Sequence, residues 1–241
     1  GDLAITSTWI HTSEASGIWM ECPTGCDCPI RPALDLTTSI VANNRITGVS
    51  LTGAAATLDR VRITATRRGG QYFFGELGGG LSAAACSQLV ALGLTSSDNA
   101  SYGILIDASD ALLGQDGEGQ GLEVRHNLIG VWVQGATGKE QMHLENALLE
   151  DNDAVGIGIA GETQGFIVCR SQVLHTQLAT VLNAVGTTDQ LGDGIVWLDG
   201  AQITLDEVTL GDNARASLVI DGPVAPGSTI QSLTLTAGDE S

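Results

Sequence analysis

Short runs of alternating apolar and polar residues, each opened by a glycine, recur along the 241-residue chain. Gly48 is followed by VSLT and Gly103 by ILID, so the first and third residues after the glycine are apolar. Side chains of a strand point alternately to two faces, and these two residues therefore share one face. We expect strands whose buried faces carry Ile18/Met20, Val49/Leu51, Ile104/Ile106, Val131/Val133, Ile157/Ile159, Ile195/Trp197 and Leu218/Ile220.

A turn residue precedes the opening glycine at a nearly fixed distance. Asn44 lies four residues before Gly48, and Asn127 lies three before Gly130, in each case after a second strand-like run. Asparagine tolerates left-handed backbone angles, its amide bonds to the backbone at turns, and stacked amides bond to each other. We therefore expect corners at Asn44, Asn99, Asn127, Asn152 and Asn213, with Ser13 and Gln190 in the same place ahead of Gly17 and Gly194.

The spacing of the repeat indicates the architecture. The positions Gly17, Gly48, Gly103, Gly130, Gly156, Gly194 and Ser217 are 31, 55, 27, 26, 38 and 23 residues apart, and the gap of 55 holds one degenerate copy near RRGGQYFFGELGGG. A period in the twenties without helical patterning is typical of stacked β coils. Propeller blades need about 40 residues each, and the leucine spacing of leucine-rich repeats is absent.

The repeat, with its asparagine corners, resembles the right-handed parallel β-helix of the pectin-lyase-like superfamily from about residue 3 to residue 236. The resemblance implies an all-β solenoid of about eight or nine coils with an asparagine ladder, forming one domain over residues 1–241. Irregular insertions are expected near 22–32, 67–82 and 174–192. Because neither end carries an amphipathic cap, we expect a segment of a longer chain, with further coils or caps at its ends.

Charge narrows the classes of partner. The chain has 28 acidic and 10 basic residues, a formal net charge of -18. This balance excludes nucleic acids and anionic membranes as expected partners, because a phosphate backbone needs a basic surface. A polyanionic sugar chain is disfavoured as well unless bound cations screen it. No apolar run approaches the length of a membrane span.

The five cysteines divide into a cluster and two single residues. Cys22, Cys26 and Cys28 stand in the loop CPTGCDCPIRP, and a disulfide within this cluster, in an oxidising compartment, is the favoured interpretation. A metal site and unpaired thiols are the alternatives. Cys86 and Cys169 lie about three coils, or about 14 Å, apart, which is too far for a disulfide, and both are expected to be buried thiols.

The outward position of the glycine-led strands is unexpectedly apolar. Exposed tryptophans are platforms for sugar rings or partner proteins, so Trp19 and Trp132 are candidate ligand-binding residues. The alternative is that long loops fold over this face and bury it. Two residues after each glycine the sequence has Trp19, Ser50, Leu105, Trp132, Gly158, Val196 and Val219.

Candidate chemistry is sparse, and the strings of polygalacturonase-like hydrolases are absent. Arg125 and His126 in EVRHN, with His143 and Glu145 one coil onward, form the nearest approach to an acid–base group on one flank. The same residues are explained as solvated outward positions of alternating strands. Acidic loops offer oxygen ligands for calcium: Asp107, Asp110, Asp116 and Glu118, then Glu150, Asp151 and Asp153, then Asp189 and Asp193.

The superfamily resemblance implies no single activity, because such proteins include lyases, hydrolases, epimerases, tailspikes and adhesins. The regular repeat and the missing catalytic strings favour a non-catalytic secreted or cell-surface β-helix that is structural, adhesin-like or glycan-contacting. A polysaccharide lyase or glycoside hydrolase of the same fold is the alternative. The expected partners are polysaccharide or other surface proteins outside the cell, and no cofactor is required, although calcium fits the acidic loops.

Overall fold

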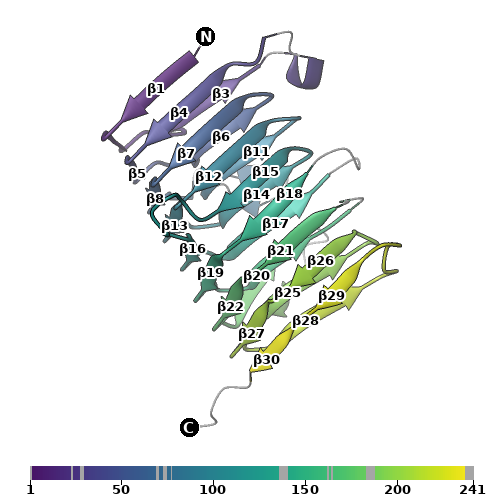
Figure 1. Cartoon of the computed structure of the whole chain (residues 1–241). Coiled ribbons are helices and arrows are strands. Elements are labelled where there is room, and N and C mark those ends of the chain that lie inside the picture. Colours follow the sequence, from purple (N-terminus) through teal and green to yellow (C-terminus); the bar gives the residue numbers. More distant parts are fainter. Residues whose placement is uncertain are drawn as a thin grey trace.

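A computed structural model shows that the chain winds into stacked coils whose strands form three long parallel sheets (Figure 1). The structure describes residues 2–22, 24–27, 30–68, 71–72, 75–76, 78–135, 141–161, 163, 165–182 and 188–236. Within these ranges sheets A and B have nine strands each and sheet C has eight. Eight full coils and two strands of a ninth follow from these numbers, as the repeat predicts.

The strands of the three sheets follow one another in the order A, B, C along each coil. Sheet A comprises β1 (Asp2–Thr6), β4 (Ala33–Thr37), β7 (Ala55–Asp59), β12 (Gln88–Leu92), β15 (Asp110–Gly114), β18 (Met142–Glu145), β21 (Phe166–Cys169), β26 (Ile203–Asp206) and β29 (Thr229–Gln231). Sheet B comprises β2 (Trp9–His11), β5 (Ile40–Ala42), β8 (Arg62–Thr64), β13 (Thr95–Ser97), β16 (Leu122–Arg125), β19 (Ala147–Glu150), β22 (Gln172–Leu174), β27 (Thr209–Gly211) and β30 (Thr234–Thr236). Sheet C comprises β3 (Ile18–Glu21), β6 (Thr47–Thr52), β11 (Gly79–Ala84), β14 (Tyr102–Asp107), β17 (Ile129–Gln134), β20 (Val155–Ile159), β25 (Asp193–Leu198) and β28 (Ala216–Asp221).

One short helix and two strand pairs lie outside sheets A, B and C. The 3-10 helix η1 (Gly25–Asp27) follows β3. Two antiparallel pairs of strands each lie between a sheet B strand and the next sheet C strand. They are β9 (Gln71–Tyr72) with β10 (Gly75–Glu76), and β23 (Ala179–Leu182) with β24 (Thr188–Leu191). The three elements fall within residues 22–32, 67–82 and 174–192.

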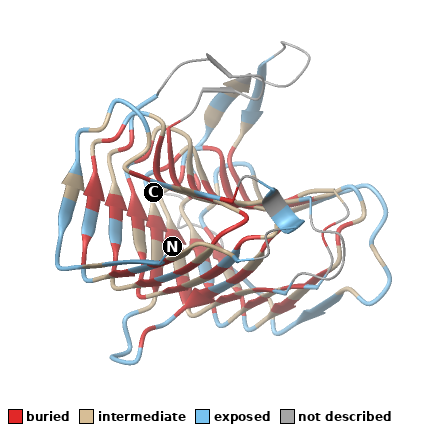
Figure 2. Cartoon of the chain, turned by 90° about the horizontal axis from the view of Figure 1, so that it is seen from above, coloured by how far each residue is buried: buried red, intermediate tan, exposed pale blue. Residues whose placement is uncertain are grey.

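Stacked apolar residues fill the interior of the coils, and buried and less buried residues alternate along the strands (Figure 2). The register aligns the predicted core residues Val49 and Ile104 with Leu81 on the strand of sheet C between them. Trp197 is buried as predicted, and its Nε1–H donates to the carbonyl of Ala201 at 2.7 Å. Burial of these side chains is the main stabilising contribution of the coil.

The corner between sheets B and C carries the row of asparagines. Nδ2 of Asn99 donates to Oδ1 of Asn127 at 3.0 Å, and Nδ2 of Asn127 donates to Oδ1 of Asn152 at 3.1 Å. The left-handed residue is the one before each asparagine, for example His126 with φ 54° and Asp151 with φ 52°. The amide therefore connects the coils, while its neighbour makes the tight turn.

Other coils place a smaller residue in the same corner. The backbone N–H groups of Ser13, Thr66 and Thr176 donate to Oδ1 of Asn44, Asn99 and Asn213, each at 3.1 Å. Ser13 therefore lies where the sequence places it. Gln190 does not, because it belongs to β24 and Thr176 makes the corner 18 residues before Gly194.

The opening glycines are required by close packing between coils. A Cβ atom at Gly103 would lie 2.8 Å from the carbonyl oxygen of Gly130 and 2.9 Å from Nδ2 of Asn127. Neither distance allows a methyl group, since real Cβ contacts are longer. Gly80 in β11 has the same surroundings and is the copy that the 55-residue gap conceals.

The prediction of a disulfide inside the cysteine cluster is wrong for Cys26, which is bonded to Cys86 with a Cα–Cα distance of 5.1 Å. Cys86 is therefore not the buried thiol that the sequence suggests. Cys22 is also disulfide-bonded, and Cys28 lies outside the described residues. The disulfide therefore joins the irregular loop that follows β3 to the end of β11. The strand pattern alone does not reveal this contact.

Cys169 is a free thiol, and it is half-buried rather than buried. Burial and the nearby Glu145 carboxylate raise the pKa of this thiol, and Arg170 opposes the shift. We expect a non-reducing digest to yield a disulfide-linked fragment that contains both Cys26 and Cys86. In the unfolded protein, Cys169 is expected to react with an alkylating reagent without prior reduction. Recovery of Cys86 as a free thiol would contradict the pairing.

Both ends of the coil stack expose residues at core positions. Leu3 at the first coil and Ile220, Ile230 and Leu235 at the last are exposed, although their register partners Leu34, Trp197, Leu205 and Leu210 are buried. The same inward position is thus buried or exposed according to whether a neighbouring coil covers it.

Candidate functional site

The outward face of sheet C carries one continuous row of side chains. The register pairs Trp19 with Ser50, Ser50 with Ser82, Ser82 with Leu105, Leu105 with Trp132, Trp132 with Gly158, Gly158 with Val196 and Val196 with Val219. The sequence predicts this row apart from Ser82. Trp19 is 68% exposed, and Trp132 is half-buried four strands away, which is about 19 Å at the usual strand spacing.

The indole of Trp132 lies over the adjacent strand of sheet C. A Cβ atom at Gly158 would overlap the six-membered ring of Trp132, so the indole covers this glycine. Nε1–H of Trp132 donates to Oε1 of Gln134 at 2.8 Å, which fixes the orientation of the ring. The absence of a side chain at position 158 therefore allows the indole of Trp132 to lie there.

Tyr102 lies on the same sheet in a comparable way. A Cβ atom at Gly79 would overlap its ring, and its hydroxyl bonds to Thr47 and Ser82. Burial raises the pKa of Tyr102, and the two hydrogen bonds act in the opposite direction. Two aromatic rings are thus held against this face by glycines.

The C-terminal half of the face is covered. Val196 packs with Val155 in a second apolar cluster to which Ala179, Val181 and Leu191 of the β23–β24 hairpin contribute. The prediction that loops bury this face is therefore correct for the coils around β25. The coils that carry Trp19 and Ser50 lie outside that cluster.

The structure does not bring the four predicted catalytic residues together. Arg125 and His126 lie at the end of β16 in sheet B, whereas His143 and Glu145 belong to β18 in sheet A. Arg125 lies 3.5 Å from Glu123, and Glu145 is paired with Arg170. The expected common flank is wrong, because the corner at Asn146 turns the chain between the two sheets. Lys139 lies outside the described residues.

The four predicted calcium ligands are also divided. Asp107 and Asp110 flank the corner from sheet C to sheet A, and Asp110 accepts the N–H of Gln141 at 2.9 Å. Asp116 is buried beyond the other end of β15, where its Oδ1 accepts N–H groups of Glu118 and Gln120.

Arg60 occupies the position that a cation would take beside Asp116 and Glu118. Its Nη1 lies 2.7 Å from Oε1 of Glu118, and its Nε lies 3.9 Å from Oδ2 of Asp116. These contacts place one positive charge beside the two carboxylates. Asp193, from another predicted loop, is fully buried and bonded to Arg215.

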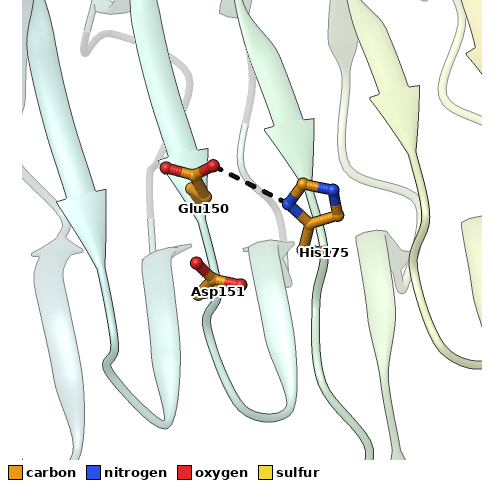
Figure 3. A group of neighbouring side chains, drawn as sticks. All are labelled: Glu150, Asp151 and His175. Carbon is orange, nitrogen blue, oxygen red and sulfur yellow. Dashed lines mark ion pairs between the residues drawn. The ribbon is translucent and has the colours of Figure 1, made fainter.

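Within the described ranges, Glu150, Asp151 and His175 form the group whose ligand atoms come closest together. One ligand atom from each lies within 4.8 Å of the others, and all three residues are half-buried. Glu150 and Asp151 end one sheet B strand, and His175 follows the adjacent strand, so that the three lie side by side (Figure 3). The sequence indicates the acidic pair but not His175, because 25 residues separate it from Glu150.

This group belongs to a longer row at the corner between sheets B and C. The left-handed residues of five successive coils are alternately acidic and imidazole: Asp98, His126, Asp151, His175 and Asp212. Nδ1 of His126 lies 3.4 Å from Asp98, and its Nε2 lies 3.8 Å from Asp151. Each histidine therefore has carboxylates on both sides.

Two hollows lie elsewhere on the surface. One, of about 400 Å³, is lined by residues at the C-terminal coils, including Asp212, Arg215 and Leu235. The other, of about 280 Å³, lies over sheet B and includes Glu123 and Arg170. Neither is lined by any of the four predicted catalytic residues.

The chain is a right-handed parallel β-helix with an aromatic row on one sheet and an Asp–His row at one corner. No protein-family model matches the chain, and no curated protein matches it. Among solved structures it is similar to the periplasmic alginate epimerase AlgG, with a TM-score of 0.53, 11% sequence identity, and coverage of 97% of this chain and 60% of the epimerase chain. At this identity the likeness shows the fold.

None of the helices in the described ranges is long and apolar enough to cross a membrane.

Proposed function

We propose that this chain is a non-catalytic, extracytoplasmic β-helix module that contacts glycans with the outward face of sheet C. The observation that carries the proposal is the indole of Trp132 over Gly158, in the same outward row as the exposed Trp19. Flat aromatic rings present an apolar face to the C–H groups of a sugar ring, and a polar rim to its hydroxyls. Ser50 and Ser82 between them supply hydroxyl groups along the row.

The placement of the acid–base candidates supports a binding role over the lyase or hydrolase alternative. A general acid and base must both reach one substrate atom within hydrogen-bond distance. His126 and Glu145 lie on different sheets, and Glu145 is engaged with Arg170. Neither of the two hollows described above has two carboxylates at its floor.

Charge selects the class of glycan. The net charge of -18 repels a uronate chain unless cations intervene, so neutral polysaccharides are the expected ligands. The structural neighbour acts on alginate, which is a polyuronate, and this makes alginate with a divalent cation the informative comparison. The Cys26–Cys86 disulfide supports an oxidising, extracytoplasmic location.

The exposed core positions at both ends favour a partner that covers them, because a parallel β-helix leaves unpaired strand edges at an uncovered end. Such a partner extends the module along its axis and leaves the face of sheet C available.

Replacing Trp132 with alanine is expected to weaken glycan binding about tenfold or more, since truncation of a stacked aromatic residue removes a central contact. Binding is measured by calorimetry against glucan, mannan and galactan, and against alginate with and without calcium. Trp9→Ala is the matched control, because Trp9 is 63% exposed on sheet B, away from the row.

Equal losses in Trp132→Ala and Trp9→Ala would contradict the proposed face, as would the absence of binding to every polysaccharide in the panel. Each mixture is also assayed for new reducing ends and for the ultraviolet absorbance of unsaturated uronates. Turnover by the wild-type chain would establish the enzyme alternative.

A further inference from the structure

The corner between sheets B and C holds side chains that the proposed glycan face does not use. Glu150 and Asp151 come from one coil and His175 from the next, with ligand atoms within 4.8 Å of one another. Ligand atoms around a tetrahedral zinc ion lie about 3.3 Å apart, given bonds of about 2.0–2.1 Å. The side chains must therefore move closer together by about 1.5 Å when an ion binds.

The surroundings of His175 orient it as a metal ligand. Its Nε2 lies 3.2 Å from Oδ2 of Asp212, and its Nδ1 lies 3.7 Å from Oε1 of Glu150. The Asp212 carboxylate favours a proton on Nε2, which leaves the lone pair of Nδ1 directed toward the Glu150 side. Metal-binding histidines usually have a carboxylate or carbonyl at the second ring nitrogen in this way.

The backbone holds the group in place. Asp151 and His175 have φ values of 52° and 54°, which the tight corners of successive coils require. Glu150 is registered with Leu174, the residue before His175, in the ladder of sheet B. The three Cα positions are therefore set by the coil, so that little conformational entropy is lost when the side chains converge on an ion.

The donor set selects the class of metal. Calcium prefers six to eight oxygen ligands, whereas one imidazole with two carboxylates suits zinc and related transition metals. We propose that Glu150, Asp151 and His175 bind one divalent transition-metal ion of the zinc class, with Asp212 as a positioning residue. His126 faces Asp151 from the other side, with its Nε2 3.8 Å from Oδ2 of Asp151.

The site is tested by titrating tag-free protein, stripped with a chelator, with Zn²⁺ in a calorimeter. One ion is expected to bind per chain and to raise the midpoint of thermal unfolding, because the ion binds only the folded corner. His175→Gln is expected to weaken binding by at least about tenfold, and Asp212→Asn by about tenfold. His143→Gln, on sheet A, is the matched control and is expected to bind as the wild type does.

Co²⁺ gives a second readout, because its visible absorption reports the nitrogen and oxygen ligands directly. The His175→Gln spectrum is expected to lose the wild-type bands, while the thermal midpoint of the metal-free variant stays close to that of the wild type. The proposal is overturned if His175→Gln and the wild type bind Zn²⁺ equally, if the wild type does not bind it, or if equimolar Ca²⁺ displaces it.

Discussion

Replacing Asn127 with alanine is expected to lower the free energy of unfolding by about 3–5 kcal/mol. Asn127 is fully buried, and its Oδ1 accepts both the backbone N–H and the Nδ2–H of Asn99. Its Nδ2 donates to the carbonyls of Ser96 and Arg125 and to Oδ1 of Asn152. Alanine leaves the buried backbone N–H of Asn99 without this acceptor and removes the four other hydrogen bonds, and each buried group left unsatisfied costs about 1–3 kcal/mol.

Asn44 provides the matched control for this prediction. It is buried to the same degree, but its Nδ2 has no hydrogen-bond partner, and Oδ1 accepts the N–H of Ser13. Asn44→Ala is therefore expected to cost clearly less than Asn127→Ala in urea unfolding followed by circular dichroism. Equal losses at the two positions would show that the amide hydrogen bonds between coils do not decide the difference.

Replacing Arg215 with alanine is expected to destabilise the fold by about 3–5 kcal/mol, because the buried charge of Asp193 loses its counterion. The side chain of Asp193 is 0% exposed, and Arg215 binds both of its oxygens, with Nε–Oδ1 at 2.8 Å. The hydrogen bond to Asp193 is also the main reason that the pKa of Arg215 is raised. Chemical unfolding of the variant at neutral pH measures the loss.

Two further variants separate the buried charge from the loss of a long side chain. Adding Asp193→Asn to Arg215→Ala is expected to restore part of the stability, since a neutral amide costs less to bury than a carboxylate. Arg45→Ala, which breaks the exposed pair with Glu14, is expected to cost at most about 1 kcal/mol. A loss at Arg45 as large as that at Arg215 would refute the role of burial.

The fold could be predicted from the sequence because the repeat is local. Gly48, Val49 and Leu51 indicate a strand, its face and its opening within four residues, and the same signal returns in each coil. The outward row with Trp19 and Trp132 follows from the same alternation, and the register confirms it. The degenerate copy is harder to recognise in the sequence, because its opening glycine, Gly80, follows a long insertion.

The contacts between residues of different coils could not be predicted in the same way. Cys26 and Cys86 are 60 residues apart, and the loop that carries Cys26 belongs to no repeat. His143 and Glu145 were expected beside His126, but a one-residue corner at Asn146 sends them to another sheet. The asparagine corners between sheets B and C agree with the sequence, whereas the corner between sheets A and B at Asn146 has no marker in the repeat.

The sequence by itself determined the coil, its core residues and the corner asparagines, because these depend on the alternation within a strand and on the turn that follows it. Only the tertiary structure decided which side chains meet across coils, such as His175 with Glu150 and Asp212. Those pairs lie 25 and 37 residues apart, and the β23–β24 hairpin lies within the second interval. The hydrogen-bonded register of the stacked strands, about 4.8 Å apart, brings them together, and no local pattern encodes that register.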